Sequence, residues 1–275
     1  MINVKKYSGE LVPFNAKSLQ HSLLRSGATQ EQVEKVYASI QDQLYDGIST
    51  KELYQLAFDS LKSHKDSYAA RYSLKKALRE LGPEGFHFER WIGKLFASDG
   101  YETVTGQTVQ GHAVTHEIDV VAAKENNLLA IECKFRNDVD AKISVTTPMY
   151  FMSRVKDISN RKITFFGREY NFTDGWLVTN AYLTSDSKDF GKYYNINLLS
   201  WDYPADNSIK LRVDNKGLYP VTCLTRLTDK DKATLLENDC ILVSDLLEDS
   251  KFLDKLQVDK LKTEQILREA RELIS

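Results

Sequence analysis

The feature that most constrains the fold is a pair of apolar runs joined by a short polar segment. The first run is His116-Glu-Ile-Asp-Val-Val-Ala-Ala and the second is Leu128-Leu-Ala-Ile-Glu-Cys-Lys-Phe135, with Lys-Glu-Asn-Asn between them. Short apolar runs on either side of an Asn-containing turn predict a β-hairpin. Charged residues inside such strands are costly to bury without partners, so the hairpin must also bring them together with compensating groups.

The spacing of the charged residues places three of them on one face of the hairpin. Glu132 and Lys134 are two residues apart and therefore share a face. A turn at Glu125-Asn126 pairs Asp119 with Glu132, whereas a turn at Asn126-Asn127 pairs Asp119 with Lys134. Because opposite residues in an antiparallel pair share a face, both registers place Asp119 beside the other two.

Two carboxylates and an ammonium in apolar strands suggest a metal site. Asp119 and Glu132 would be the ligands of Mg²⁺ or Mn²⁺, since these hard cations prefer oxygen donors. Lys134 would orient a water or stabilise charge growing on a phosphate, and Glu89, on the preceding helix, would be a further ligand or base. The alternative is a charged strand face with cross-strand ion pairs, because Glu-x-Lys alone is frequent by chance.

Sequence motifs around these residues resemble a known nuclease fold. GFHFERWIGKLFASDGYE, HEIDVV and IECKF are similar to the PD-(D/E)xK restriction-endonuclease-like fold in its Mrr-like branch, over residues 83–205. The resemblance implies Mg²⁺-dependent DNA cleavage by Asp119, Glu132 and Lys134, with Glu89 as the helix carboxylate. Alternating strand and helix patterns predict, independently, a mixed sheet flanked by helices. Weaker candidates, for which packing or solvation is the alternative, are His116, Tyr150, Arg154, Thr179 and Asn180.

The first 82 residues predict a hairpin followed by four helices. Thr29 with Gln32, and Ser49 with Glu52, are capping-box pairs, and a fourth helix is expected over residues 67–81, before Gly82-Pro83. VKKYSGELVPFN, LYDGIST and AARYSLKKAL resemble the ATP-cone, a small regulatory nucleotide-binding domain.

The ATP-cone resemblance implies that Lys6, Asn15 and Thr50 bind ATP or dATP. The family usually has a basic residue three positions after the equivalent of Asn15, where this chain has Ser18, so Lys17 is the candidate that compensates. No P-loop or Rossmann motif is present, which predicts that the nucleotide regulates and is not hydrolysed. A purely structural helical cap is the alternative.

Residues 206–275 predict an all-helical part, with Thr228 and Ser244 as helix N-caps. LTRLTDKDKATLLENDCILVSDLL and LDKLQVDKLKTEQILREAREL resemble tandem helix-hairpin-helix repeats. Glycines that such hairpins use to contact DNA phosphates are replaced at 238–240 and 257–259. Packing or dimerisation is therefore an equal alternative to DNA contact.

Composition restricts the partners and the compartment. The formal net charge is −2, so a nucleic-acid partner requires a local basic patch. Three scattered cysteines predict neither a disulfide framework nor a zinc site, and no apolar run approaches the ~18 residues of a membrane span. We expect a multi-domain α+β and α/β protein of the cytoplasm that does not cross a membrane.

Three functions are compatible with these patterns. The first is a Mg²⁺-dependent DNA endonuclease regulated by ATP or dATP, which suggests a homodimer if both strands are cut. The second is a nucleotide-gated nucleic-acid-binding protein that does not cleave. The third is an assembly module whose ATP-cone switches the oligomeric state.

Overall fold

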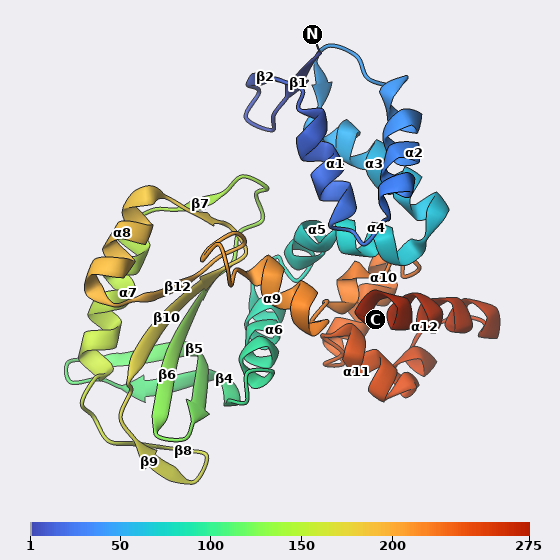
Figure 1. The fold of residues 1–275 in the computed structure, drawn as a ribbon. Coiled ribbons are helices and arrows are strands. Elements are labelled where there is room, and N and C mark those ends of the chain that lie inside the picture. The colour runs from blue at the N-terminus through green and yellow to red at the C-terminus, as the bar shows by residue number, and fades with distance from the viewer. Residues whose placement is uncertain (1) are drawn as a thin grey trace. The chain divides into compact units, whose positions relative to one another are not determined.

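A computed structural model describes residues 2–275, which form two compact units (Figure 1). One unit is Leu78–Leu218, and the other combines Met1–Ala77 with Tyr219–Ser275. The expected fold class is confirmed, with a hairpin and helices first, a mixed sheet flanked by helices next, and a helical end. The division at residues 82 and 205 into three domains stays a prediction.

The unit Leu78–Leu218 is built on a five-stranded mixed sheet. Strand β10 is parallel to both β6 and β12, while β4, β5 and β6 are antiparallel. Helix α6 (Phe86–Ala97) lies on one side of the sheet, and α7 (Thr146–Ile158) and α8 (Ser185–Tyr194) lie on the other (Figure 1). The strand order is β12 (Asn197–Leu199), β10 (Asp174–Thr179), β6 (Asn127–Lys134), β5 (Thr115–Lys124) and β4 (Glu102–Gln110).

The β5–β6 hairpin adopts the first of the two expected registers. Lys124 pairs with Asn127 and Val120 with Ile131, so the next position along this register sets Asp119 opposite Glu132. On the other side of β5, Thr105 pairs with Val120 and Gln107 with Ile118, so Gly106 and Asp119 between them are left unpaired. Gly106 has a φ of +63°. Asp119 therefore lies where the ladder is interrupted on both sides, which leaves nearby backbone groups available to its side chain.

Both faces of the sheet are covered by apolar side chains. Phe88, Trp91 and Phe96 of α6 are almost completely buried, and Trp91 Nε1 donates to the carbonyl oxygen of Leu218 at 3.1 Å. On the opposite side, Phe151 of α7 packs with Leu177 of β10. A further hairpin, β8 (Ile163–Phe165) with β9 (Arg168–Tyr170), extends this core and was not expected from the sequence. Two short parallel strands, β7 (Lys142–Ile143) and β11 (Tyr182–Leu183), complete the unit.

The N-terminal segment of the second unit has a small sheet in the order β2-β1-β3 and a group of helices. The capping boxes at Thr29 and Ser49 are confirmed. The expected fourth helix is wrong in one respect, because Ser73 divides it; its hydroxyl bonds to the Ala70 carbonyl and competes with the helical pattern. The elements are β1 (Asn3–Lys5), β2 (Leu11–Pro13), α1 (Ala16–Leu24), α2 (Gln30–Gln41), β3 (Ile48–Ser49), α3 (Thr50–His64), α4 (Asp66–Tyr72) and α5 (Leu74–Arg79).

The C-terminal segment is helical and packs on α4 of the N-terminal segment. Arg71 Nη2 donates to the Leu273 carbonyl at 2.9 Å, and Arg226 pairs with Asp66 at 2.7 Å. Ser244 is not an N-cap: it lies inside α11, where Asp245 accepts from the backbone before the helix. The elements are η1 (Val221–Cys223), α10 (Asp229–Glu237), α11 (Val243–Glu248), η2 (Ser250–Lys255) and α12 (Lys260–Ile274), while α9 (Ile209–Lys216) belongs to the sheet unit. Among the described residues, no helix is both long and apolar enough to span a bilayer.

The close approach of α7 to β10 depends on the missing side chain of Gly175. A Cβ there would lie 2.6 Å from a Val155 methyl group and 3.1 Å from the Phe151 ring. We expect Gly175→Ala to lower the free energy of unfolding by about 1–3 kcal/mol, because overpacking displaces α7. Urea unfolding of purified protein measures this change.

Gly93, inside α6, provides the matched control. A Cβ at Gly93 would meet its nearest neighbour at 3.6 Å, which is ordinary contact. Gly93→Ala should therefore be neutral or stabilising by up to about 1 kcal/mol, the usual gain in a helix interior. Equal effects of the two substitutions would show that the α7–β10 contact is not close-packed.

Candidate functional site

The carboxylate of Glu132 is the centre of the site. Its side chain is 3% exposed, and its two oxygens contact two different cations, Lys134 Nζ on the same strand and Arg154 Nη1 on α7. Arg154 is held in place by a second bond from Nη2 to the Glu117 carbonyl. A buried carboxylate needs such compensation, since removal of one partner leaves an unpaired charge in the interior.

Asp119 lies next to this ion-pair cluster. Its Oδ2 accepts a hydrogen bond from the backbone N–H of Cys133 at 2.6 Å. Burial, together with the charge of Glu132, raises the pKa of Asp119 to about 6, even though that hydrogen bond and the charges of Lys134 and Arg154 act in the opposite direction. The β5–β6 register thus brings Asp119 to the cluster, as expected.

Glu89 reaches the same cluster from α6. Burial raises the pKa of Glu89 to about 7, and the charges of Asp119, Glu117 and Glu132 add to this rise. The four residues predicted as catalytic, Glu89, Asp119, Glu132 and Lys134, therefore form one electrostatic group drawn from α6, β5 and β6. Clusters of carboxyl groups with shifted pKa values are typical of functional sites.

The chemistry of the donors fits a divalent cation of the Mg²⁺ or Mn²⁺ type. Carboxylate oxygens are the ligands these ions prefer. Burial first, and repulsion from neighbouring carboxylates second, raise the pKa values of Glu89 and Asp119, and a cation would relieve that repulsion. Within residues 2–275, however, no three His, Cys, Asp or Glu side chains converge closely enough to hold an ion. Lys134 and Arg154 supply the positive charge at Glu132 instead.

Arg154 carries an unsatisfied donor at the site. Its Nε is buried and has no hydrogen-bond partner in the described chain. An orphaned buried donor is uncommon in folded proteins, and strain, a functional role, or an ordered water or ion accounts for such groups. From the sequence, Arg154 was only a weak candidate for contact with a nucleic-acid backbone. Its bond to Glu132 joins residues 22 positions apart, and a local sequence pattern does not reveal such a contact.

The weaker candidates have structural partners of their own. His116 pairs with Asp157 at 2.7 Å, and the same carboxylate accepts from Ala113 N at 2.8 Å, which fastens the β4–β5 loop to α7. Thr179 donates to the Lys134 carbonyl at 2.5 Å, and Asn180 Oδ1 accepts from the backbone N–H of Arg136 at 2.8 Å. These two residues fix the end of β6. Tyr150 is 63% exposed, and the Arg154 guanidinium lies 5.9 Å from its ring.

Only some of the predicted nucleotide-binding residues lie together. Lys5 pairs with Ser49 across the parallel strands β1 and β3, so Lys6 and Thr50, which follow them, are neighbours. Asn15 lies at the opposite end of β1, since Phe14 N donates to the Ile2 carbonyl, and its side chain caps α1 by accepting from Ser18 N at 3.0 Å. Lys17, in the first turn of α1, is exposed, and Lys6 pairs with Glu10 at 3.1 Å.

The raised pKa of Glu89 predicts a pH-dependent gain of stability in Glu89→Gln. Above pH 7, Glu89 is charged in the folded protein, and its burial then costs free energy. In the unfolded chain the pKa of Glu89 is about 4.3, so its charged form carries no such cost. The neutral amide removes that cost, so Glu89→Gln should melt at a higher temperature at pH 8, and the gain should shrink from pH 7 towards about 4. Calorimetry in EDTA, with exposed Glu102→Gln as control, measures it. The same gain at both ends of the pH range, or none at pH 8, would contradict the prediction.

Three family models match consecutive parts of the chain. Residues 2–81 match the ATP cone domain, residues 81–203 match the restriction endonuclease model, and residues 219–274 match the AF1548-like C-terminal model. The helix-hairpin-helix likeness of the third part stays a prediction.

The relatives that match have no assigned function. An uncharacterized protein of Archaeoglobus fulgidus is 28% identical over 184 residues, which are 66% of this chain and 99% of that protein. The crystal structure of the protein of unknown function AF1548 has a TM-score of 0.56 and 27% identity, and covers 69% of this chain and 97% of its own. This chain therefore joins an ATP cone domain to a restriction-endonuclease-like domain, as its motifs predicted, and its C-terminal part matches the AF1548-like C-terminal model, which the motifs did not indicate.

Proposed function

We propose that this chain is a metal-dependent endonuclease that hydrolyses phosphodiester bonds in DNA and is regulated by ATP or dATP. The observation that carries the proposal is the buried Glu132 carboxylate between Lys134 and Arg154, with Asp119 and Glu89 beside it. The match of residues 81–203 to the restriction endonuclease model supports nuclease chemistry, and the ATP cone match supports nucleotide regulation.

Each residue has a distinct role in the proposed reaction. Asp119 and Glu132 would hold Mg²⁺ or Mn²⁺, which supplies a Lewis acid for the scissile phosphate and lowers the pKa of a bound water. Lys134 stabilises negative charge as it grows on the phosphate oxygens. Glu89, with a pKa of about 7, is suited to accept a proton from the attacking water near neutral pH.

Arg154 is proposed to contact the phosphate directly. Its unpaired Nε is a donor without an acceptor, and guanidinium groups bind phosphate oxygens in a two-pronged manner. Its bond to Glu132 would be exchanged for a bond to the phosphate when DNA binds. Exposed Tyr150 lies next to it and offers a ring for stacking on a base.

The nucleotide is proposed to bind at the end of the β1–β2 hairpin. Lys6 and Thr50 lie side by side there, at the start of α3, where backbone N–H groups favour an anion. Lys17 adds positive charge on α1, and Asn15 contributes from the other end of β1. Cleavage of both strands would require two such chains, and we propose a homodimer for that reason.

A non-cleaving, nucleotide-gated nucleic-acid-binding or assembly protein is the second candidate. It is favoured by one observation: Lys134 and Arg154 already neutralise Glu132 without an ion, and no three metal-binding side chains converge in residues 2–275. Such a protein would bind DNA equally well in Mg²⁺ and in EDTA and would leave it intact.

Substitution of the carboxylates tests the enzyme. Asp119→Asn, Glu132→Gln and Lys134→Ala should each reduce cleavage of plasmid or single-stranded DNA by at least about 10²-fold, as the loss of a metal ligand or charge stabiliser does. Cleavage is measured with Mg²⁺ or Mn²⁺, with and without ATP. The amide variants keep the shape of the side chain, and circular dichroism checks the fold.

The control is Glu102→Gln, which neutralises an exposed carboxylate at the far end of β4 and should cleave like the wild type. Wild-type cleavage by Glu132→Gln would disprove the assignment. Binding without cleavage in every wild-type condition would favour the second candidate.

Nucleotide binding predicts a rise in melting temperature. A ligand that binds only the folded state stabilises it, by about 2.7 kcal/mol at a hundredfold excess over its Kd. Lys6→Ala should reduce the shift caused by ATP or dATP. Lys35→Ala is the matched control, because it also removes an exposed i,i+4 ion pair, with Glu31 at 2.7 Å, and it should leave the shift unchanged. An equal shift in both variants would exclude Lys6 from the site.

A further inference from the structure

We propose that a cavity beside the edge strand β12 binds one nucleotide unit, a base together with its phosphate. The cavity measures about 230 Å³ and is bordered by α8, α9 and the loop that leads into α9. Trp176 of β10 forms part of its wall. Because Leu177 pairs with Glu132 and side chains alternate along a strand, Trp176 and Glu132 point to opposite faces of the sheet, so this site is separate from the carboxylate cluster.

The cavity offers an aromatic surface for a base. The Trp176 indole is half-buried and meets Phe96 edge to face, with ring centroids 5.3 Å apart. Tyr203 provides a second ring in the lining. Stacking of a base on tryptophan contributes about 1–3 kcal/mol and tolerates any base.

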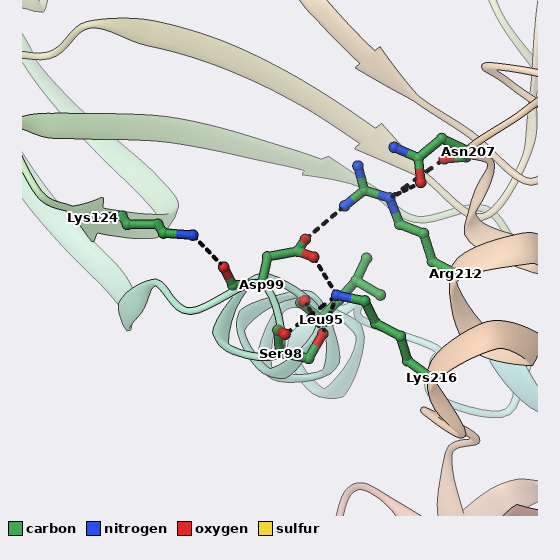
Figure 2. Close-up of polar contacts among 7 residues, drawn as sticks. All are labelled: Leu95, Ser98, Asp99, Lys124, Asn207, Arg212 and Lys216. Atoms are coloured by element: carbon green, nitrogen blue, oxygen red, sulfur yellow. Dashed lines mark hydrogen bonds and ion pairs between the residues drawn. The ribbon is translucent and has the colours of Figure 1, made fainter.

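Arg212 presents a free donor in the same lining. Its Nη1 donates to Asp99 Oδ2 and its Nε to Asn207 Oδ1, both at 3.1 Å, and its guanidinium lies 5.7 Å from the centre of the Trp176 ring. Figure 2 shows the second terminal nitrogen pointing away from both partners. Within the described chain, that nitrogen makes no hydrogen bond. Arg212 is thus fixed by its two partners, Asp99 and Asn207, and keeps one donor for a ligand.

The charge around Arg212 is not balanced. Lys216 also bonds to Asp99, so two cations share a single carboxylate and leave a net charge of about +1 (Figure 2). Lys192 of α8 adds a further exposed cation to the lining, and none of the described residues that line the cavity is acidic. The surplus positive charge favours an anion.

A second cavity in the same unit shows the contrast. It measures about 270 Å³, but its two cations, Lys162 and Arg168, are matched by Glu125 and Glu169 in the lining. Lys162 pairs with Glu169 at 2.7 Å. The two cavities are of similar size, so the charge and the aromatic wall distinguish the β12 cavity as the one suited to an anion with a planar ring.

The size of the cavity suits a small ligand such as a single nucleotide unit. Sites for larger organic ligands usually measure about 300–1,000 Å³. A base against Trp176 with its phosphate near Lys192 and Arg212 uses the ring, the free donor and the surplus charge together. The unit can come from a free mononucleotide or from a nucleic-acid strand, which present the same chemistry.

Fluorine NMR of the full chain labelled with 5-fluorotryptophan tests the proposal. The chain has three tryptophans, Trp91, Trp176 and Trp201, and Trp176→Phe identifies the signal of Trp176. The probes are dAMP and a short single-stranded oligodeoxyadenylate, both in EDTA so that no cleavage occurs. We expect a saturable shift of the Trp176 signal. A shift with dAMP identifies the free nucleotide as the ligand, and a shift with the oligonucleotide alone identifies the strand.

Matched charge reversals separate this site from general electrostatic attraction. Lys192→Glu should weaken binding by about tenfold or more, the usual effect of losing a hydrogen bond to a charged group. Lys162→Glu, in the other cavity, should leave the titration unchanged. The proposal is overturned if neither probe shifts the Trp176 signal, or if Lys192→Glu and Lys162→Glu weaken binding equally. Loss of nuclease activity does not affect this test.

Discussion

The compensation of one buried carboxylate sets the geometry of the sheet unit. Glu132 lies in a strand whose neighbouring side chains are apolar, and it is 3% exposed. Burial of that charge is tolerated because Lys134 and Arg154 each contact one of its oxygens. Arg154 can reach Glu132 only if α7 lies against β10, and the absence of a side chain at Gly175 permits that approach.

The charged forms of two carboxyl groups at the site are unfavourable, and the remaining interactions of the sheet unit must offset this cost in free energy. Glu89 and Asp119 have raised pKa values because burial and mutual repulsion disfavour their charged forms. A protein selected for stability alone would replace such groups with neutral ones. The hydrogen bond from the backbone N–H of Cys133 stabilises the charged form of Asp119. Thr179 and Asn180 hold the end of β6 in place. Their hydrogen bonds are structural, yet they determine where Lys134 lies.

The sequence predicted what depends on local patterns and missed what depends on distant partners. The β5–β6 hairpin, its turn and the capping boxes at Thr29 and Ser49 follow from residues a few positions apart. The interruption of the β4–β5 pairing at Gly106 is indicated in the sequence by a glycine within a strand pattern. Such a glycine often marks a bulge, but the alternation of apolar residues does not predict where the pairing breaks. The bonds from Arg154 to Glu132 and from Arg212 to Asp99 join residues 22 and 113 positions apart, and only tertiary packing brings them together.

The order of the segments along the chain bears on how a nucleotide signal would act. The ATP cone segment and the C-terminal segment share one compact unit, joined by Arg226 with Asp66 and by Arg71 with the Leu273 carbonyl. The sheet unit is inserted between them and is connected to that unit covalently at both ends. Stabilisation of the ATP cone by the proposed ligand would therefore extend to the C-terminal helices, because helices that pack together tend to unfold together. α4, which carries Asp66 and Arg71, is the element through which the two segments are coupled.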